Sequence, residues 1–242
     1  LSLRRQRQMC IRDRIEGAKV VAIVRNGESV ESAAAGEDVE VVLDRTPFYA
    51  EMGGQQGDAG ELSAEGVALT VSDTKNHNGL YAHVAHVTEG TLTVGATVTA
   101  ALDAERRGFL RRNHTATHLL DAALKQVLGE HVSQAGSLVT PEHLRFDFTH
   151  FETLSSEQLK AVEDLVNQQI FASKPVVTRV MGIDEAKAAG AVALFGEKYG
   201  DVVRVVSVGA EDQPFSRELC GGTHAANTAE IGLFKIISES ST

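Results

Sequence analysis

Apolar and polar positions alternate in short runs over the first part of the chain. Between about residues 18 and 101, these runs are rich in valine and threonine and are separated by glycine or polar pairs. Short, evenly spaced strands with turn signals between them predict a small β-barrel or sandwich. The runs cover residues 20–24, 39–43, 67–71, 81–87 and 92–100.

A glycine-rich segment separates the second of these runs from the third. Residues 44–60 read D-R-T-P-F-Y-A-E-M-G-G-Q-Q-G-D-A-G, with four glycines and one proline. Because the segment also carries Phe48 and Tyr49, we interpret it as an ordered loop rather than a linker. Long ordered loops often carry function.

The hydrophobic period changes from strand to helix at Asp103. Asp103 can cap a helix that runs to Gly129, with leucine and valine repeating on one face at positions 120, 124, 127 and 128. We expect α+β architecture: a barrel over residues 15–102 and a mixed α/β two-layer domain over 103–242. The later elements expected are a hairpin (131–140 with 143–148), a helix opened by S-S-E-Q at 155–158, strands at 176–181, 202–208 and 232–238, and a short helix at 184–190.

Residues 1–14 do not share either period. They hold five arginines and one aspartate, in a chain whose net charge is -10. We interpret this segment as an unstructured or foreign extension rather than a functional basic arm. Cys10, which lies in it, is therefore given no chemical role.

Composition narrows the class of protein. The 242 residues are 43% hydrophobic and 23% charged, as in globular proteins. No apolar run reaches the roughly 18 to 20 residues of a membrane span, and two cysteines suit a reducing, cytoplasmic setting. The acidic net charge disfavours general binding to polyanions, so we expect neither DNA nor a membrane as a partner. Neither a G-x-x-x-x-G-K-[ST] loop nor a strand-linked G-x-G-x-x-G is present.

Two motifs carry candidate chemistry, N-H-T-A-T-H at residues 113–118 and L-C-G-G-T-H at 219–224. His114 and His118 are four apart on the expected helix, so their rings share one face. Cys220 and His224 have the same spacing around a glycine pair that allows a tight turn. Three imidazole nitrogens and one thiolate suit Zn²⁺, either as a catalytic site with an open position or as a closed site.

The alternative is that these histidines and this cysteine are ordinary buried core residues. On the expected helix, however, His114 and His118 point about 115° away from the apolar stripe. We therefore expect the pair to face a rim or cleft. The intervening T-A-T has no glutamate, which excludes a zinc protease of the H-E-x-x-H type.

Four arginines lie close to the first histidine motif on a chain that is otherwise acidic. They indicate either a solvated helix face or a surface that holds the phosphates of one specific RNA. The arginines are Arg106, Arg107, Arg111 and Arg112.

Gln134 lies in the segment H-V-S-Q-A-G-S. Taken alone, it would be a solvent-facing strand residue.

Several motifs together resemble the editing region of bacterial alanyl-tRNA synthetases, which is shared with free-standing alanyl-tRNA editing proteins. The resemblance covers nearly everything after Arg14. It rests on the glycine-rich loop at 44–60 and on R-R-N-H-T-A-T-H-L-L, H-V-S-Q-A-G-S-L-V, L-R-F-D-F-T-H, A-L-F-G-E-K-Y-G-D-V-V-R-V-V and S-R-E-L-C-G-G-T-H, in that order.

The resemblance implies a zinc site at the junction of a β-barrel and an α/β domain. It implies hydrolysis of the ester of serine or glycine mischarged onto alanine tRNA. A pocket for a methyl side chain rejects the hydroxyl-bearing isostere by only about 10²-fold, so a second, hydrolytic site is needed. The implied zinc ligands are His114, His118, Cys220 and His224, with Cys220 counted among the catalytic residues.

Two further residues gain a role from the same resemblance. Gln134 corresponds to a glutamine that positions substrate and water, and Thr46 corresponds to the hydroxyl that senses serine. A free-standing editing protein and a non-catalytic, zinc-stabilised tRNA-binding module remain alternatives. Since no ATP-binding module fits before Arg14, we expect no aminoacylation by this chain. The sequence does not specify the oligomeric state.

Overall fold

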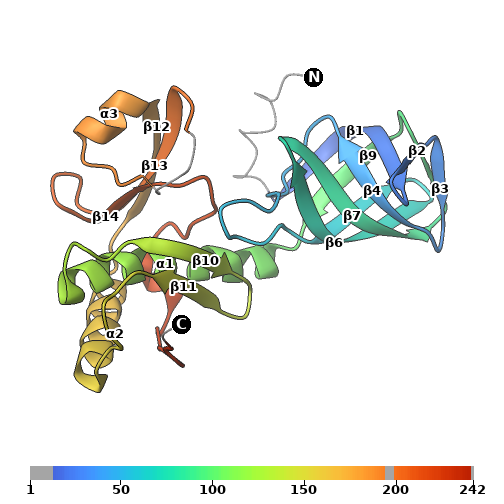
Figure 1. Cartoon of the computed structure of the whole chain (residues 1–242). Helices are drawn as coiled ribbons and strands as arrows, with labels where there is room; N and C mark the ends of the chain where they lie inside the picture. The colour runs from blue at the N-terminus through green and yellow to red at the C-terminus, as the bar shows by residue number, and fades with distance from the viewer. Residues whose placement is uncertain (1–12, 194–198, 241–242) are drawn as a thin grey trace. The chain divides into compact units, whose positions relative to one another are not determined.

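The computed structural model describes residues 13–193 and 199–240 (Figure 1). Residues 1–12, with Cys10 and most of the expected extension, lie outside the described residues. The chain forms two compact units, one of residues up to 52 with 56–108 and the other of residues 53–55 with 109–242. The fold is α+β, as predicted, and helices are few in the described part of the chain. None of the helices in the described part of the chain is both long enough and apolar enough to cross a membrane.

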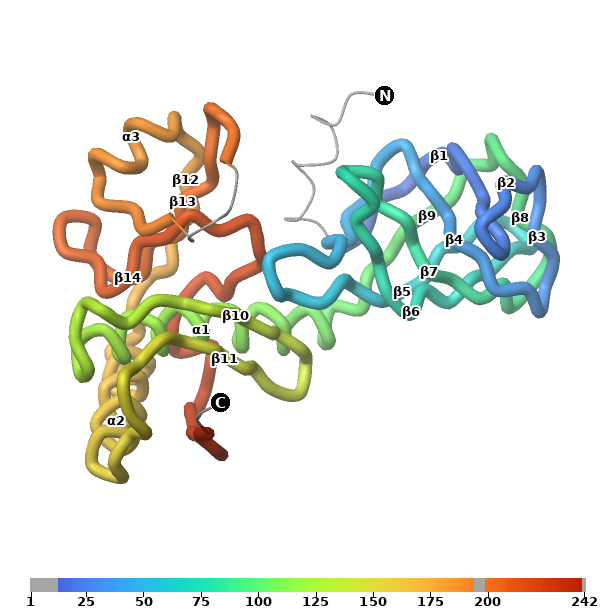
Figure 2. The backbone as a smooth tube through the Cα atoms, in the orientation of Figure 1, coloured from blue at the N-terminus to red at the C-terminus, as the bar shows by residue number. Residues whose placement is uncertain are grey.

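Six antiparallel strands of the first unit close into a barrel, which confirms the barrel form of the prediction. Pairing of the first strand with the last, with Lys19 opposite Thr97, completes the ring (Figure 2). One short strand, β2 (Glu28–Val30), extends the sheet on β1, and β3 (Ser32–Ala34) pairs with β8 (Thr91–Thr93) in a separate two-stranded sheet. The ring order is β1 (Arg14–Arg25), β4 (Asp38–Leu43), β7 (Leu80–Glu89), β6 (Val67–His77), β5 (Gly60–Ala64) and β9 (Thr97–Leu102).

The barrel interior is filled by the apolar set of the alternating pattern, including Ile23, Leu69 and the loop residue Phe48. Strand β5 was not predicted, because G-E-L-S-A carries one large apolar side chain, the fully buried Leu62. The single strand expected over 92–100 is two strands, since Gly95 between them has a left-handed backbone (φ +85°) that ends regular pairing.

The second unit packs helices and two small sheets around two apolar clusters, the smaller of which lies between α3 and the three-stranded sheet. The larger cluster joins one face of α1 to the β10–β11 hairpin, to α2 and to the edge of this antiparallel sheet, which is ordered β12-β13-β14. Its elements are α1 (Ala104–Leu128, from residue 109), β10 (Gln134–Val139), β11 (Leu144–Phe148), α2 (Ser156–Phe171), β12 (Val176–Gly182), α3 (Ile183–Ala188), β13 (Val202–Gly209), β14 (Pro214–Leu219) and the 3-10 turn η1 (Thr228–Ile231).

Both predicted helix starts are confirmed by their caps. Asp103 Oδ1 accepts a hydrogen bond from the Arg106 N–H at 2.9 Å, at the start of α1. Ser155 and Gln158 form a reciprocal capping box at the start of α2. The main chain therefore enters both helices where side-chain oxygens satisfy the first free N–H groups.

The strand predicted over residues 232–238 is wrong. This segment is irregular, and side chains of α2 take its backbone hydrogen bonds: the Phe234 N–H donates to Asn167 Oδ1 at 3.0 Å and the Ile236 N–H to Glu163 Oε2 at 2.9 Å. Phe234 is buried in the core. The apolar alternation that resembled a strand thus reflects packing against a helix.

A histidine is enclosed inside the barrel. His83 is fully buried, with Nδ1 2.7 Å from the Val41 carbonyl and Nε2 2.7 Å from Thr46 Oγ1. Because a carbonyl only accepts, Nδ1 carries the proton and Nε2 accepts from the Thr46 hydroxyl. Burial lowers the pKa of His83 from 6.5 to about 4, although the bond to Val41 opposes the shift.

The barrel should therefore lose stability in mild acid. The unfolded chain binds a proton at His83 near pH 6.5 and the folded chain only near pH 4, so stability is complete above pH 6.5 and falls as pH drops toward 4. Between pH 7 and 5 the loss is about 2 kcal/mol. Hydrogen exchange of barrel amides in the whole chain, followed from pH 7 to pH 5, measures this loss of stability. His83→Gln should flatten the dependence of stability on pH, and His86→Gln, at an exposed histidine, should not. An equal dependence in all three proteins would contradict the role of His83.

Candidate metal centre

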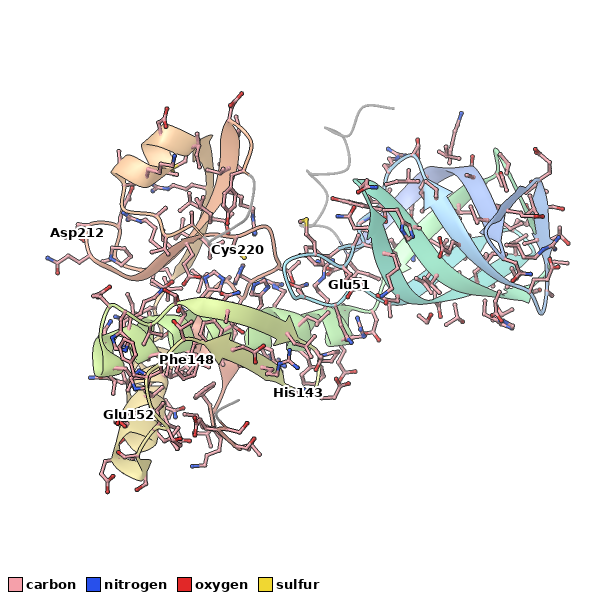
Figure 3. The ribbon with its side chains drawn as sticks, in the orientation of Figure 1. Glu51, His143, Phe148, Glu152, Asp212 and Cys220 are labelled. Atoms are coloured by element: carbon pink, nitrogen blue, oxygen red, sulfur yellow. The ribbon has the colours of Figure 1, made fainter. Side chains whose placement is uncertain are left out.

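Two elements of the second unit bring together the four residues predicted as metal ligands. Helix α1 supplies His114 and His118, and the loop after β14 supplies Cys220 and His224; Figure 3 shows Cys220 in that loop, facing α1. One nitrogen of each ring and the sulfur lie within 4.8 Å of one another. Their spacing in the sequence therefore predicted a real cluster.

The distances between the clustered atoms suit a metal ion. Cys220 Sγ lies 3.4 Å from His114 Nε2 and 3.3 Å from His224 Nε2. A tetrahedral site with a metal–sulfur bond of about 2.3 Å and metal–nitrogen bonds of about 2.0 Å separates sulfur and nitrogen by about 3.5 Å. The sulfur and the nitrogens of His114 and His224 thus already stand at ligand spacing.

The second nitrogen of two rings is held by a neighbouring oxygen. Thr115 donates its hydroxyl proton to the Arg111 carbonyl, so its oxygen accepts from His224 Nδ1 at 3.2 Å. His118 Nδ1 lies 3.2 Å from Glu218 Oε2, close enough for an ion pair although the angle is not that of a hydrogen bond. His224 therefore turns Nε2 toward the sulfur.

Charge in the cluster favours a thiolate. Burial raises the pKa of the Cys220 thiol, but the imidazoles of His114, His224 and His118 outweigh it and hold that pKa well below its usual value. The N–H of Gly222 also lies 3.4 Å from the sulfur. A thiolate is the form of cysteine that binds metals and attacks electrophiles.

The histidine pair is more enclosed than the apolar stripe predicted. His114 and His118 are 6% and 4% exposed rather than on an open rim. Helix α1 is covered on both sides over this stretch, by the apolar core around Leu119 and by the 220–225 loop with residues 53–55. Both faces of this helix are buried, but only the face that packs on the apolar core shows a periodic apolar stripe in the sequence.

The glycine pair of the C-G-G-T-H motif serves close approach. A Cβ at Gly222 would stand 2.0 Å from His114 Cε1 and 2.9 Å from Gln55 Oε1. Arg204 Nη1 donates to the Cys220 carbonyl at 2.9 Å and to the Gly222 carbonyl. The sequence predicted a tight turn at this glycine pair. The structure shows a different reason for Gly222, because any side chain there would collide with the His114 ring.

The other two residues predicted to be catalytic lie in separate units. Gln134 begins β10, opposite Phe148, and is partly exposed. Thr46 belongs to the barrel unit, is 2% exposed, and has its hydroxyl bonded to His83 and to the Phe48 N–H. Their roles stay predictions.

Two of the four arginines predicted to bind RNA have structural partners in the barrel unit. Arg107 is 3% exposed and forms an ion pair with Asp58, which is 1% exposed. Arg106 donates to the Gly57 carbonyl at 2.7 Å. A guanidinium enclosed like that of Arg107 offers no surface to a phosphate, so we propose no RNA contact for Arg107.

The other two arginines belong to the second unit. Arg111 donates from Nε to the His224 carbonyl at 2.5 Å, which ties the metal-ligand loop to α1. Arg112 is exposed and stacks over the Phe109 ring, 5.3 Å from its centroid. Arg112 is thus the arginine of this set best placed to meet a solvent-borne phosphate.

Sequence reasoning missed the side chains that hold the rings. Gln55, Thr115 and Glu218 each approach one imidazole Nδ1. Thr115 and Glu218 lie inside the recognised motifs, and Gln55 lies in the glycine-rich loop, so a search for acceptors within those motifs would have selected all three. Only the three-dimensional structure pairs each with its histidine.

Comparisons with known proteins match this chain to aminoacyl-tRNA synthetases. Residues 4–106 match the family model of the tRNA synthetases class II (A), and residues 203–242 match that of the threonyl and alanyl tRNA synthetase second additional domain. The alanine–tRNA ligase of Haemophilus influenzae (strain PittGG) is 54% identical over 222 residues, 92% of this chain and 25% of that relative. The chain thus spans about a quarter of the length of that relative. The first match begins inside the segment interpreted as an extension.

The close approach at Gly222 gives a test of the metal centre. Gly222→Ala should displace the His114 ring and lower zinc affinity by more than tenfold, measured by competition with a chromophoric chelator. Gly108→Ala, in α1 with open space around its Cα, is the matched control. It should leave zinc affinity unchanged and raise stability by up to about 1 kcal/mol. Equal zinc affinities in both variants would contradict the geometry described.

Proposed function

Because the chain belongs to the alanyl-tRNA synthetase family, we propose that it is an aminoacyl-tRNA deacylase, hydrolysing the ester of serine or glycine mischarged onto alanine tRNA. The observation that carries the proposal is the cluster of His114, His118, Cys220 and His224. Three imidazole nitrogens and a cysteine sulfur within 4.8 Å of one another favour Zn²⁺ over hard cations, which prefer oxygen ligands.

The protein's own residues would position the ester around the metal. A bound Zn²⁺ supplies positive charge that polarises a carbonyl and acidifies a water molecule. Gln134, partly exposed at the start of β10, offers an amide that can orient the substrate and that water. No hydrogen bond engages this amide within the described parts of the chain, so it is available for a ligand.

Selection of serine over alanine would come from a hydroxyl. Thr46 donates to His83 and accepts from the Phe48 N–H, which leaves one lone pair of its oxygen unused. The proposed role requires substrate to reach this oxygen, although Thr46 is only 2% exposed in this structure. A serine hydroxyl could then donate to that lone pair, whereas the methyl group of alanine could not. A site built on such a bond discriminates far better than an apolar pocket of similar size.

A second candidate is a non-catalytic, zinc-stabilised tRNA-binding module. The observation that favours it is that four protein ligands surround the site, the number typical of closed structural zinc. Such a module would unfold when zinc is removed and would not depend on Gln134. The two functions therefore differ in measurable ways.

Deacylation of charged tRNA tests the proposal. The zinc-loaded chain should release serine from serine-charged alanine tRNA and leave the alanine ester intact. Cys220→Ala should lower the rate by at least about 10²-fold, since it removes a ligand and a buried charge. Gln134→Ala should lower the rate while zinc content stays unchanged. His143→Ala, outside the cluster, is the control.

Retained tRNA and zinc binding without hydrolysis of either ester would contradict the deacylase and favour the structural module. Loss of both esters at equal rates would contradict the role of Thr46. In that case Thr46→Val, which removes the hydroxyl at nearly constant volume, should behave as the unsubstituted chain does.

Binding of the tRNA backbone generates a separate prediction. Arg112→Ala should weaken tRNA binding severalfold and reduce the slope of log affinity against log salt by about one, the effect of one lost phosphate contact. Arg179→Ala is the control, because Arg179 is an exposed arginine paired with Glu211. Filter binding over a salt series measures both; identical slopes for Arg112→Ala and the unsubstituted chain would remove Arg112 from the interface.

A further inference from the structure

A buried glutamine from the glycine-rich loop contacts the metal cluster. Gln55 is 0% exposed, and its Oε1 lies 2.7 Å from His114 Nδ1. The same oxygen accepts the backbone N–H of Thr223 at 2.9 Å, and Gln55 Nε2 donates to Thr223 Oγ1 at 3.0 Å. Every polar atom of this amide thus has a partner within the second unit.

These contacts determine which way the amide faces. The backbone N–H of Thr223 can only donate, so the amide atom that meets it must be the oxygen. Since His114 Nδ1 faces that same oxygen, Nδ1 must carry a proton. The neutral ring of His114 then has its free lone pair on Nε2, the atom 3.4 Å from Cys220 Sγ.

The backbone around Gln55 is built to deliver it to this place. The Val139 N–H donates to the Gly54 carbonyl at 2.8 Å, and Gln55 forms a parallel bridge with Val139 on β10. A Cβ at Gly54 would stand 2.4 Å from the Ser137 carbonyl oxygen, and Gly54 has a left-handed backbone (φ +80°). Glycine at this position therefore permits the approach that seats Gln55.

We propose that Gln55 is a positioning residue of the metal centre, which holds His114 in the one tautomer and ring orientation that present Nε2 to Zn²⁺. The inference rests on the proposed zinc site. Removing the acceptor that orients a metal-ligating histidine lowers metal affinity by about 10- to 100-fold. The glycine-rich loop thus contributes to metal binding without supplying a ligand.

Substitutions at Gln55 separate this role from simple packing. Gln55→Leu keeps the approximate volume without the acceptor and should lower zinc affinity by about 10- to 100-fold. Gln55→Glu keeps an oxygen that accepts from both His114 and Thr223 and should restore affinity to within a few-fold. Gln56→Leu, at the neighbouring glutamine bonded to Arg106, is the matched control and should have no effect.

A measurement on the unsubstituted protein needs no variant to fold. In the zinc-loaded chain with ¹⁵N-labelled histidine, the His114 ring should show a protonated Nδ1 and a metal-bound Nε2. The reverse assignment would overturn the proposal, as would a folded Gln55→Leu that binds zinc as tightly as Gln56→Leu does.

The outcomes distinguish this inference from the proposed function. Zinc binding that depends on Gln55 in a chain that fails to hydrolyse charged tRNA would support the inference and overturn the deacylase. Hydrolysis with zinc affinity independent of Gln55 would support the deacylase and overturn the inference. A chain that binds no zinc would overturn both.

Discussion

Three buried imidazoles converge on the sulfur of Cys220, and each has a side-chain oxygen near its second nitrogen. A buried polar group without a partner costs about 1 to 3 kcal/mol, so these contacts restrict the positions of whole segments. Gln55 and Thr115 hydrogen-bond to His114 and His224, and Glu218 lies within ion-pair distance of His118. Helix α1, the 53–55 segment and the loop after β14 are therefore interlocked, and Gly54 and Gly222 are required where the backbones come closest.

The barrel unit follows the same rule with a different result. Its buried polar groups, the Arg107–Asp58 ion pair and the His83–Thr46 hydrogen bond, are satisfied within the unit itself. The ion pair holds the loop residue Asp58, which also accepts the Tyr49 N–H at 2.6 Å, against the first turn of α1. The glycine-rich segment thus divides its residues: Thr46 and Asp58 serve the barrel, whereas Gln55 serves the metal centre.

Residue spacing along the chain predicted the features that depend on residues close together in sequence. Five of the six barrel strands, the capped starts of α1 and α2 and the i, i+4 ligand pairs were readable from spacing, whereas β5 was not. Elements whose partners are distant in sequence were not. Residues 232–238 alternate like a strand but pack on α2, and Arg107 belongs to a basic cluster but is neutralised by Asp58, 49 positions away. The pairing of Gln55 with His114 is hidden for the same reason.

The central claim is that His114, His118, Cys220 and His224 bind one zinc ion through the atoms that face one another. X-ray absorption at the zinc edge on the purified chain tests it most directly. We expect one zinc per chain, with about three nitrogen neighbours at about 2.0 Å and one sulfur at about 2.3 Å. A shell without sulfur, or a chain that takes up no zinc at equilibrium, would contradict it.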